Sequence, residues 1–212
     1  MPAAKVGYCG IKWDNTPEII GALILESGTL PSLDSFLTQG DSASDFRSSS
    51  SFFGSYTHQL DAKGRVSLPA SFRTKLEALP EKSLVLTNYL CDGARCLEAF
   101  PIQTWQIFEN RLRDLSRFDS KLKTLENFYF SRAALSSPDS SGRISVPTHL
   151  RTYAGLKDNV CFTAGLRGFR VWDQKVWDHV FSKVETALLN DPDLFKNIDK
   201  AMSSAATKNQ NE

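Results

Sequence analysis

The apolar and polar positions of this chain predict the same series of short strands and amphipathic helices twice. The first series begins near residue 52 and the second near residue 128. Each series reads as a strand, a turn, a short strand, a helix that follows a proline, two further strands and a closing helix. The predicted strands are 54–60, 66–68, 83–87 and 95–100 in the first series, and 128–135, 144–146, 159–163 and 168–172 in the second. This mixture of elements predicts an α+β fold.

The closing helix of each series carries an apolar stripe with helical spacing. The first stripe consists of Ile102, Trp105, Phe108, Leu112 and Leu115, and the second of Trp177, Val180, Phe181, Val184 and Leu188. Trp105 and Trp177 occupy equivalent places, and tryptophans in such stripes usually pack in a core. We therefore expect both helices to bury this face. Another helix, over residues 119–128 with Asp119 as its N-cap, joins the two series.

The closest repetition lies in the first turn of each series, where DAKGR at residues 61–65 recurs as DSSGR at residues 139–143. The residues that recur at constant spacing are Asp61, Gly64, Arg65, Ser67, Pro69 and Arg73, matched by Asp139, Gly142, Arg143, Ser145, Pro147 and Arg151. Units of about 60 residues are too small to hold a strong core alone. The two units should therefore bury their apolar faces against each other in one domain with a pseudo-two-fold axis.

The chain divides into a head, two repeats and a tail. We expect residues 1–51 to be a flexible or non-native N-terminal extension, 52–115 the first repeat, 116–127 the linking helix, 128–189 the second repeat and 190–212 a C-terminal tail. The head ends in QGDSASDFRSSSS, a composition typical of flexible linkers. It is either a short docking element or chain upstream of the natural start, and we expect the repeats to fold without it.

Charge and cysteine usage narrow the chemistry further. Residues 1–51 hold three basic and six acidic side chains, a net charge of −3, which leaves 22 basic and 18 acidic side chains, a net charge of +4, for the remainder. A mildly basic body is compatible with nucleic acid. No apolar run is long enough to span a membrane. The cysteines are Cys9, Cys91, Cys96 and Cys161, and their spacing matches no common zinc pattern. We therefore expect free thiols, no metal and no cofactor.

The paired acid and base of each turn allow two interpretations. Asp61 and Arg65, like Asp139 and Arg143, can fix the turn through an ion pair, or through carboxylate hydrogen bonds to turn amides. Alternatively, the arginines contact a phosphate or a guanine edge. Both roles are compatible, since the aspartate can shape the turn from which the arginine reaches out. Arg73 and Arg151, on the following helices, are either supplementary contacts or, as we favour, ordinary solvated residues.

The sequence GSYTHQLDAKGRVSLPASFR, with DSSGRISVP further on, resembles the MraZ family of bacterial transcriptional regulators. This resemblance covers residues 52–189 and implies the AbrB-like swapped-hairpin fold, with two repeats in one pseudo-two-fold β-barrel. It implies ring-like homo-oligomers that bind direct repeats in double-stranded DNA upstream of the division and cell-wall gene cluster, which includes the regulator's own gene. We expect a repressor in the cytoplasm, associated with the nucleoid.

The resemblance assigns DNA contact to the two turns, and the candidate DNA-binding residues are Asp61, Lys63, Arg65, Asp139 and Arg143. The second turn has Ser141 in place of Lys63, so the first should contribute more charge. Residues 1–51 have no recognisable counterpart in the family.

Three other classes of function fit the sequence less well. Asp61 and Asp139 suggest paired catalytic carboxylates, but each has its own arginine, and no nucleophile, phosphate loop or metal set accompanies them. We therefore expect no enzyme and no small-molecule ligand. A protein-binding or scaffold module that uses the closing helices is the alternative function. An RNA-binding protein ranks low because the aromatic residues form no evident stacking platform.

Overall fold

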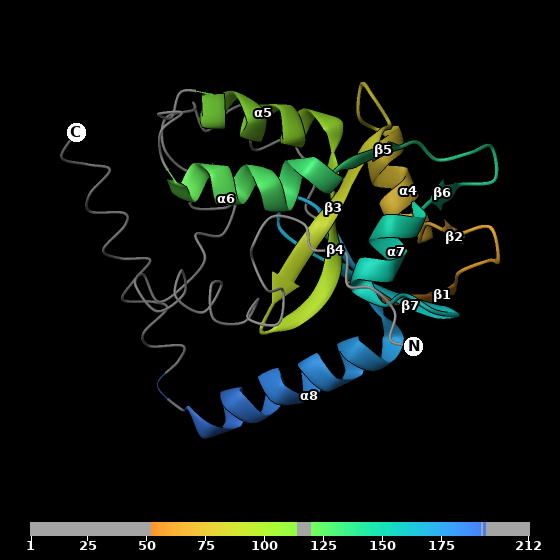
Figure 1. The fold of residues 1–212 in the computed structure, drawn as a ribbon. Coiled ribbons are helices and arrows are strands. Elements are labelled where there is room, and N and C mark those ends of the chain that lie inside the picture. The colour runs from red at the N-terminus through yellow and green to blue at the C-terminus, as the bar shows by residue number, and fades with distance from the viewer. Residues whose placement is uncertain (1–51, 114–119, 192, 194–212) are drawn as a thin grey trace, which may run out of the picture.

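The computed structural model describes residues 52–113, 120–191 and 193, and its elements are labelled as in Figure 1. The strands are β1 (Ser55–Gln59), β2 (Arg65–Ser67), β3 (Leu84–Cys91), β4 (Ala94–Pro101), β5 (Ala134–Ser136), β6 (Arg143–Ser145), β7 (Asn159–Ala164) and β8 (Phe169–Asp173). The helices are α4 (Ala70–Glu77), α5 (Ile102–Arg113), α6 (Ser120–Tyr129), the 3₁₀ helix η2 (Phe130–Arg132), α7 (Thr148–Ala154) and α8 (Gln174–Asn190). The predicted α+β class is confirmed.

The strands form a six-stranded antiparallel sheet, in the order β1-β7-β8-β4-β3-β5, and a separate two-stranded ribbon of β2 and β6. Each repeat lends its first strand to the other, since β1 pairs with β7 and β5 pairs with β3. The predicted barrel is not closed among the described residues. The three-residue strands β2 and β6 pair along their length only with each other, and a single bridge from Leu60 to Val66 joins β2 to the chain before it.

The predicted strand at residues 128–135 is wrong over most of its length. Helix α6 continues to Tyr129, η2 follows, and the strand occupies only Ala134–Ser136. Two side chains of β3 hold the end of this helix: Thr87 Oγ1 donates to the Tyr129 carbonyl oxygen at 2.6 Å, and Asn88 Nδ2 donates to that of Phe128 at 3.1 Å. Carbonyl groups at a helix end need such outside donors. Burial of neighbouring aromatic rings in the same place favours helix here over the strand.

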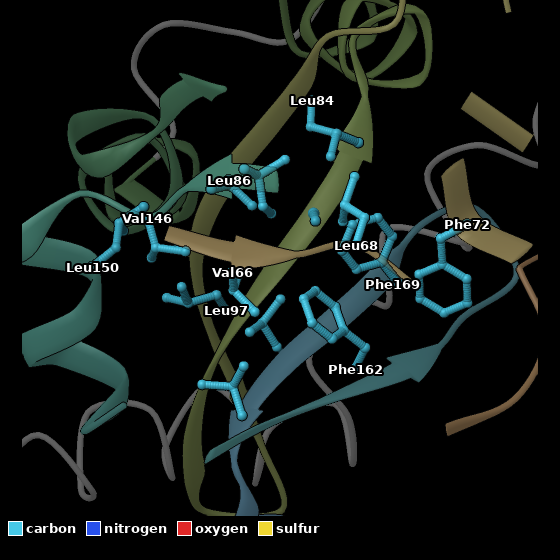
Figure 2. Packing of buried hydrophobic residues seen from close by; sticks show 14 of the residues in the cluster. Val66, Leu68, Phe72, Leu84, Leu86, Leu97, Val146, Leu150, Phe162 and Phe169 are labelled. Carbon is cyan, nitrogen blue, oxygen red and sulfur yellow. The ribbon is translucent and has the colours of Figure 1, made fainter. Parts of the chain in front are cut away.

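The main core lies on one face of the six-stranded sheet, beneath α4, α7 and the ribbon, and takes half of its buried residues from each repeat. From the first repeat come Phe52, Val66, Leu68, Phe72, Leu76, Leu84, Leu86, Leu97 and Ala99, and from the second Ile144, Val146, Leu150, Ala154, Leu156, Val160, Phe162, Phe169 and Val171. Figure 2 shows side chains from both repeats converging on this core. The two units therefore share one core, as their small size predicts.

The second face of the sheet is covered by the closing helices, and they are not buried alike. Trp105 of α5 is buried, as predicted, among Phe100, Phe108 and Phe130. Trp177 of α8 is only half-buried, so its prediction as a core residue is wrong in part. Val180 is buried beside it, whereas Phe181 is 51% exposed. Leu115 and Asp119 lie outside the described residues.

The cysteines within the described residues are free thiols, as the sequence predicts. Cys96 and Cys161 are buried and Cys91 is half-buried. Burial raises the pKa of Cys91 to about 11 and that of Cys96 well above its ordinary value, so these thiols stay protonated. Cys9 lies outside the described residues.

Candidate nucleic-acid interface

The first turn is a closed hydrogen-bonded unit built around the Asp61 carboxylate. Oδ1 accepts from the backbone N–H of Lys63 at 2.9 Å and of Arg65 at 2.8 Å. Oδ2 accepts from the Arg65 guanidinium, with Nε at 2.8 Å and Nη2 at 2.7 Å. The Gly64 N–H donates to the Asp61 carbonyl oxygen at 2.8 Å and completes the reversal. One side chain thus shapes the loop and orients the arginine.

The second turn repeats this arrangement contact for contact. Asp139 Oδ1 accepts from the N–H groups of Ser141 and Arg143, each at 2.9 Å. Its Oδ2 accepts from Arg143 Nε at 3.0 Å and Nη2 at 2.9 Å. The aspartate and arginine side chains are exposed to the same extent in both turns, 37% and 35% respectively. The turn-fixing role that the sequence offers for the aspartates is therefore present in the structure, and it is compatible with DNA contact by the arginines.

The electrostatics of the two aspartates follow from these contacts. The backbone N–H and the guanidinium of Arg65 stabilise the ionised carboxylate and lower the pKa of Asp61. The pKa of Asp139 is lowered in the same way, with the backbone N–H of Arg143 as the largest cause. Neither carboxyl is tuned toward neutral pH, so neither suits proton transfer as a general acid or base.

The ribbon brings the two turns together. In the antiparallel pair of β2 and β6, Arg65 lies opposite Ser145, Ser67 opposite Arg143, and the buried Val66 and Ile144 opposite each other. Because side chains alternate across a strand, both arginines and both serines lie on the ribbon face turned away from the core. The two arginines are about 7 Å apart along the ribbon axis, a spacing of two residues. Figure 1 shows the two turn loops side by side next to β2 and β6.

Arg73 and Arg151 cross from one repeat to the turn of the other. A Cβ atom on Gly64 would lie 2.7 Å from both Cζ and Nε of Arg151, and one on Gly142 would lie 2.5 Å from Nη1 of Arg73. Each arginine is half-buried, and its Nε is buried without a hydrogen-bond partner. The prediction that these were ordinary solvated residues is therefore wrong. Their places in the repeat were visible in the sequence, but the crossing between repeats was not.

Each turn arginine retains donors for a ligand. A guanidinium carries five N–H donors in a fixed fork, and the aspartate occupies only part of it. The ion pair fixes the rotamer in advance, which reduces the entropy lost on binding. Among the described residues Lys63 adds an exposed cation to the first turn, where the second has the exposed Ser141. This arrangement can bind phosphate oxygens or acceptor atoms on a base edge.

Known proteins match this chain across both turns. The family model described as "MraZ protein, putative antitoxin-like" matches the chain twice, at residues 51–128 and 129–194. The chain belongs to the MraZ family. A family member from Acetivibrio thermocellus is 39% identical over 127 residues, covering 60% of this chain and 84% of that protein. One from Natranaerobius thermophilus is 32% identical over 139 residues, covering 66% and 92%. Both proteins carry the name Transcriptional regulator MraZ, which is the name of a regulator and not of an enzyme.

Each of the two MraZ matches contains one of the two turns. The first contains Asp61–Arg65 and the second contains Asp139–Arg143, and the boundary between them falls where α6 ends. Within the described residues, no group of three or more His, Cys, Asp and Glu side chains is arranged to hold a metal ion. The described helices include none that is long and apolar enough to cross a membrane.

Proposed function

We propose that this chain is a transcriptional regulator that binds double-stranded DNA through the β2–β6 ribbon and its two turns. The observation that carries the proposal is the pair of Asp–Arg turns, identical in their contacts, on the outer face of one ribbon. The names of the relatives support the regulatory role. DNA offers repeated phosphates and base edges, and two matched arginines can bind two such groups at once.

The five candidate residues take different parts in this function. Asp61 and Asp139 hold the arginines in their binding rotamers. Arg65 and Arg143 donate to phosphate oxygens or to the acceptor edge of guanine. Lys63 adds a phosphate contact to the first turn only. The exchange of the first strands, in which β1 pairs with β7 and β5 with β3, and the pairing of the equivalent strands β2 and β6 support a swapped-hairpin arrangement. In it, two repeats take the places of the two chains of an AbrB-type dimer.

We further propose that the protein represses the division and cell-wall cluster, including its own gene, by binding direct repeats as a ring-like oligomer at the nucleoid. One chain supplies two turns, so a ring multiplies weak sites and raises avidity when the spacing of the DNA repeats fits. The exposed apolar residues of α8 support a contact between subunits; they are Phe181, Val184, Leu188 and Leu189. The same residues favour the second candidate function, a protein-binding module without DNA binding.

A titration separates the two candidates. A labelled duplex that carries the region upstream of the gene is titrated with the protein, beside a duplex of scrambled sequence, while light scattering gives the particle mass. We expect tighter binding to the upstream duplex and a particle larger than a dimer. Absence of binding to either duplex, with a folded protein, would leave the protein-binding module as the function.

A further inference from the structure

We propose that Arg73 and Arg151 bind the DNA backbone, and that each phosphate site is shared between the repeats. One site combines the turn Asp61–Arg65 with Arg151 of α7, and the other combines the turn Asp139–Arg143 with Arg73 of α4. The inference rests on the proposed function and adds to it two cations that lie outside the turns.

The charge balance of each turn leads to this assignment. Arg65 and Arg143 each form an ion pair with an aspartate of their own turn, so neither pair carries net charge. Within the part of the chain that the structure describes, the side chain of Arg73 has no hydrogen-bond or ion-pair partner, and that of Arg151 has only the bond that Nη2 donates to Thr148 Oγ1 at 2.9 Å. The positive charge beside the turns therefore comes from Arg73, Arg151 and Lys63. Affinity for DNA depends chiefly on cations of this kind.

The packing holds both arginines in place before any ligand arrives. The guanidinium of Arg151 lies against the Gly64 backbone and that of Arg73 against the Gly142 backbone, where any side chain on the glycine would collide with them. Because these rotamers are already restricted, little side-chain entropy remains to be lost on binding. Lys75, two residues along α4, is exposed and has no such support.

A purely structural role does not account for the chemistry of these side chains. Support of a turn by packing alone needs only the aliphatic stem, which an uncharged side chain could supply. Here each stem ends in a guanidinium whose Nε is buried without a partner, and burying an unpaired donor costs free energy. An anionic group bound at the outer nitrogens offsets this cost. In the proposed complex the phosphate groups of DNA lie next to the turns and provide this anionic group.

The test replaces each arginine and measures the salt dependence of binding. Arg73→Gln and Arg151→Gln remove the charge and keep most of the stem, Lys75→Gln is the matched control on the same helix, and Arg73→Lys keeps the charge. Binding to the upstream duplex and to the scrambled duplex is measured by fluorescence anisotropy over a range of salt concentrations, beside a thermal melt of each variant.

Each glutamine variant should make the slope of log affinity against log salt shallower by about one unit, on both duplexes alike, because phosphate contacts carry no sequence information. Lys75→Gln and Arg73→Lys should keep the wild-type slope. Wild-type slopes in both glutamine variants, with normal binding by the unaltered protein, would overturn this inference and leave the proposed function intact. Failure of the unaltered protein to bind either duplex would overturn both.

A measurement on the unaltered protein covers the case in which a variant does not fold. Phenylglyoxal modifies accessible arginines, and mass spectrometry locates the modified residues. Bound duplex should protect Arg73 and Arg151 several-fold. Equal modification of these two arginines with and without duplex, at saturating duplex, would overturn the inference.

Discussion

The two repeats of this chain match at their turns and differ at their closing helices. Each aspartate accepts four bonds, from equivalent positions in the two turns, and the lengths of equivalent bonds agree within 0.2 Å. The closing helices α5 and α8 have similar apolar stripes, yet only the first is well buried. Trp105, Phe108 and Leu112 of α5 are each at most 6% exposed.

The difference comes from what lies against each helix. Helix α6 and η2 cover the apolar face of α5, and the Phe130 ring lies 4.8 Å from that of Trp105. No described element covers α8 in this way. Trp177 contacts Trp172 of the sheet and Phe181 of its own helix, and Leu189 is 80% exposed. All the hydrogen-bonding groups of a turn lie within five residues, so a repeated motif forms the same turn in both places. Burial of a helix depends instead on elements elsewhere in the chain.

The largest effect should come from truncating the two equivalent tryptophans. Trp105→Ala removes a buried ring and should lower the free energy of unfolding by about 3–5 kcal/mol. Trp177→Ala removes a half-buried ring and should cost about 1–2 kcal/mol. Urea denaturation of both variants checks this, with the m-value as the control for two-state unfolding. Equal losses would mean that α8 is covered as fully as α5.

Alanine at the turn glycines should destabilise both repeats to the same degree. Gly64 and Gly142 have φ of +78° and +71°, and a left-handed residue other than glycine costs about 1–2 kcal/mol. The new methyl group would also displace Arg151 or Arg73. Gly155→Ala is the matched control, because its φ is +61° and its Cβ would have no neighbour within 4 Å. A loss in the turn variants no larger than in this control would show that the arginines adjust freely.

Removal of the turn arginines should affect DNA binding unequally. Arg65→Ala and Arg143→Ala should each lower the salt slope by about one unit if a phosphate contact is lost, or reduce sequence discrimination by about 1–3 kcal/mol if a base contact is lost. At low salt Arg65→Ala should do less harm, because Lys63 remains beside it. Salt titrations of both variants, and of each combined with Lys63→Ser, measure this difference. Unchanged affinity with a lowered melting temperature would mean that the arginines are structural and that DNA is read elsewhere.

The smallest effect concerns acid. The pKa of Asp61 and of Asp139 is lower in the folded protein than the ordinary 3.8. Each therefore contributes stability above the unfolded pKa, and that stability is lost as the pH falls through the folded pKa. Asp61→Asn and Asp139→Asn should each flatten the fall of melting temperature between neutral pH and about pH 3. The two variants should behave alike, and a flattening confined to one of them would show that the turns differ in solution.

Much of this molecule is determined by interactions close in sequence. The alternation of Arg65, Val66 and Ser67 gives β2 one buried and one exposed face. The groups that close the first turn all lie within residues 61–65, so the repeated motif predicted the turn and allowed its ion pair as one interpretation. The apolar stripes predicted both closing helices, and the small size of the units predicted a shared core.

Only the tertiary structure decided which elements meet across the repeats. The pairing of β1 with β7 and the contact of Arg151 with Gly64 could not be predicted from the sequence, because those partners are about a hundred residues apart. The helix through Phe128 and Tyr129 replaced a predicted strand because Thr87 and Asn88 of β3 donate hydrogen bonds to the carbonyl oxygens at its end and aromatic rings bury its side. Trp105 and Trp177 have the same local pattern, and their different burial follows from the neighbours that the fold supplies. Local hydrogen bonds can be read from spacing, whereas burial is a property of the surfaces that the folded chain brings together.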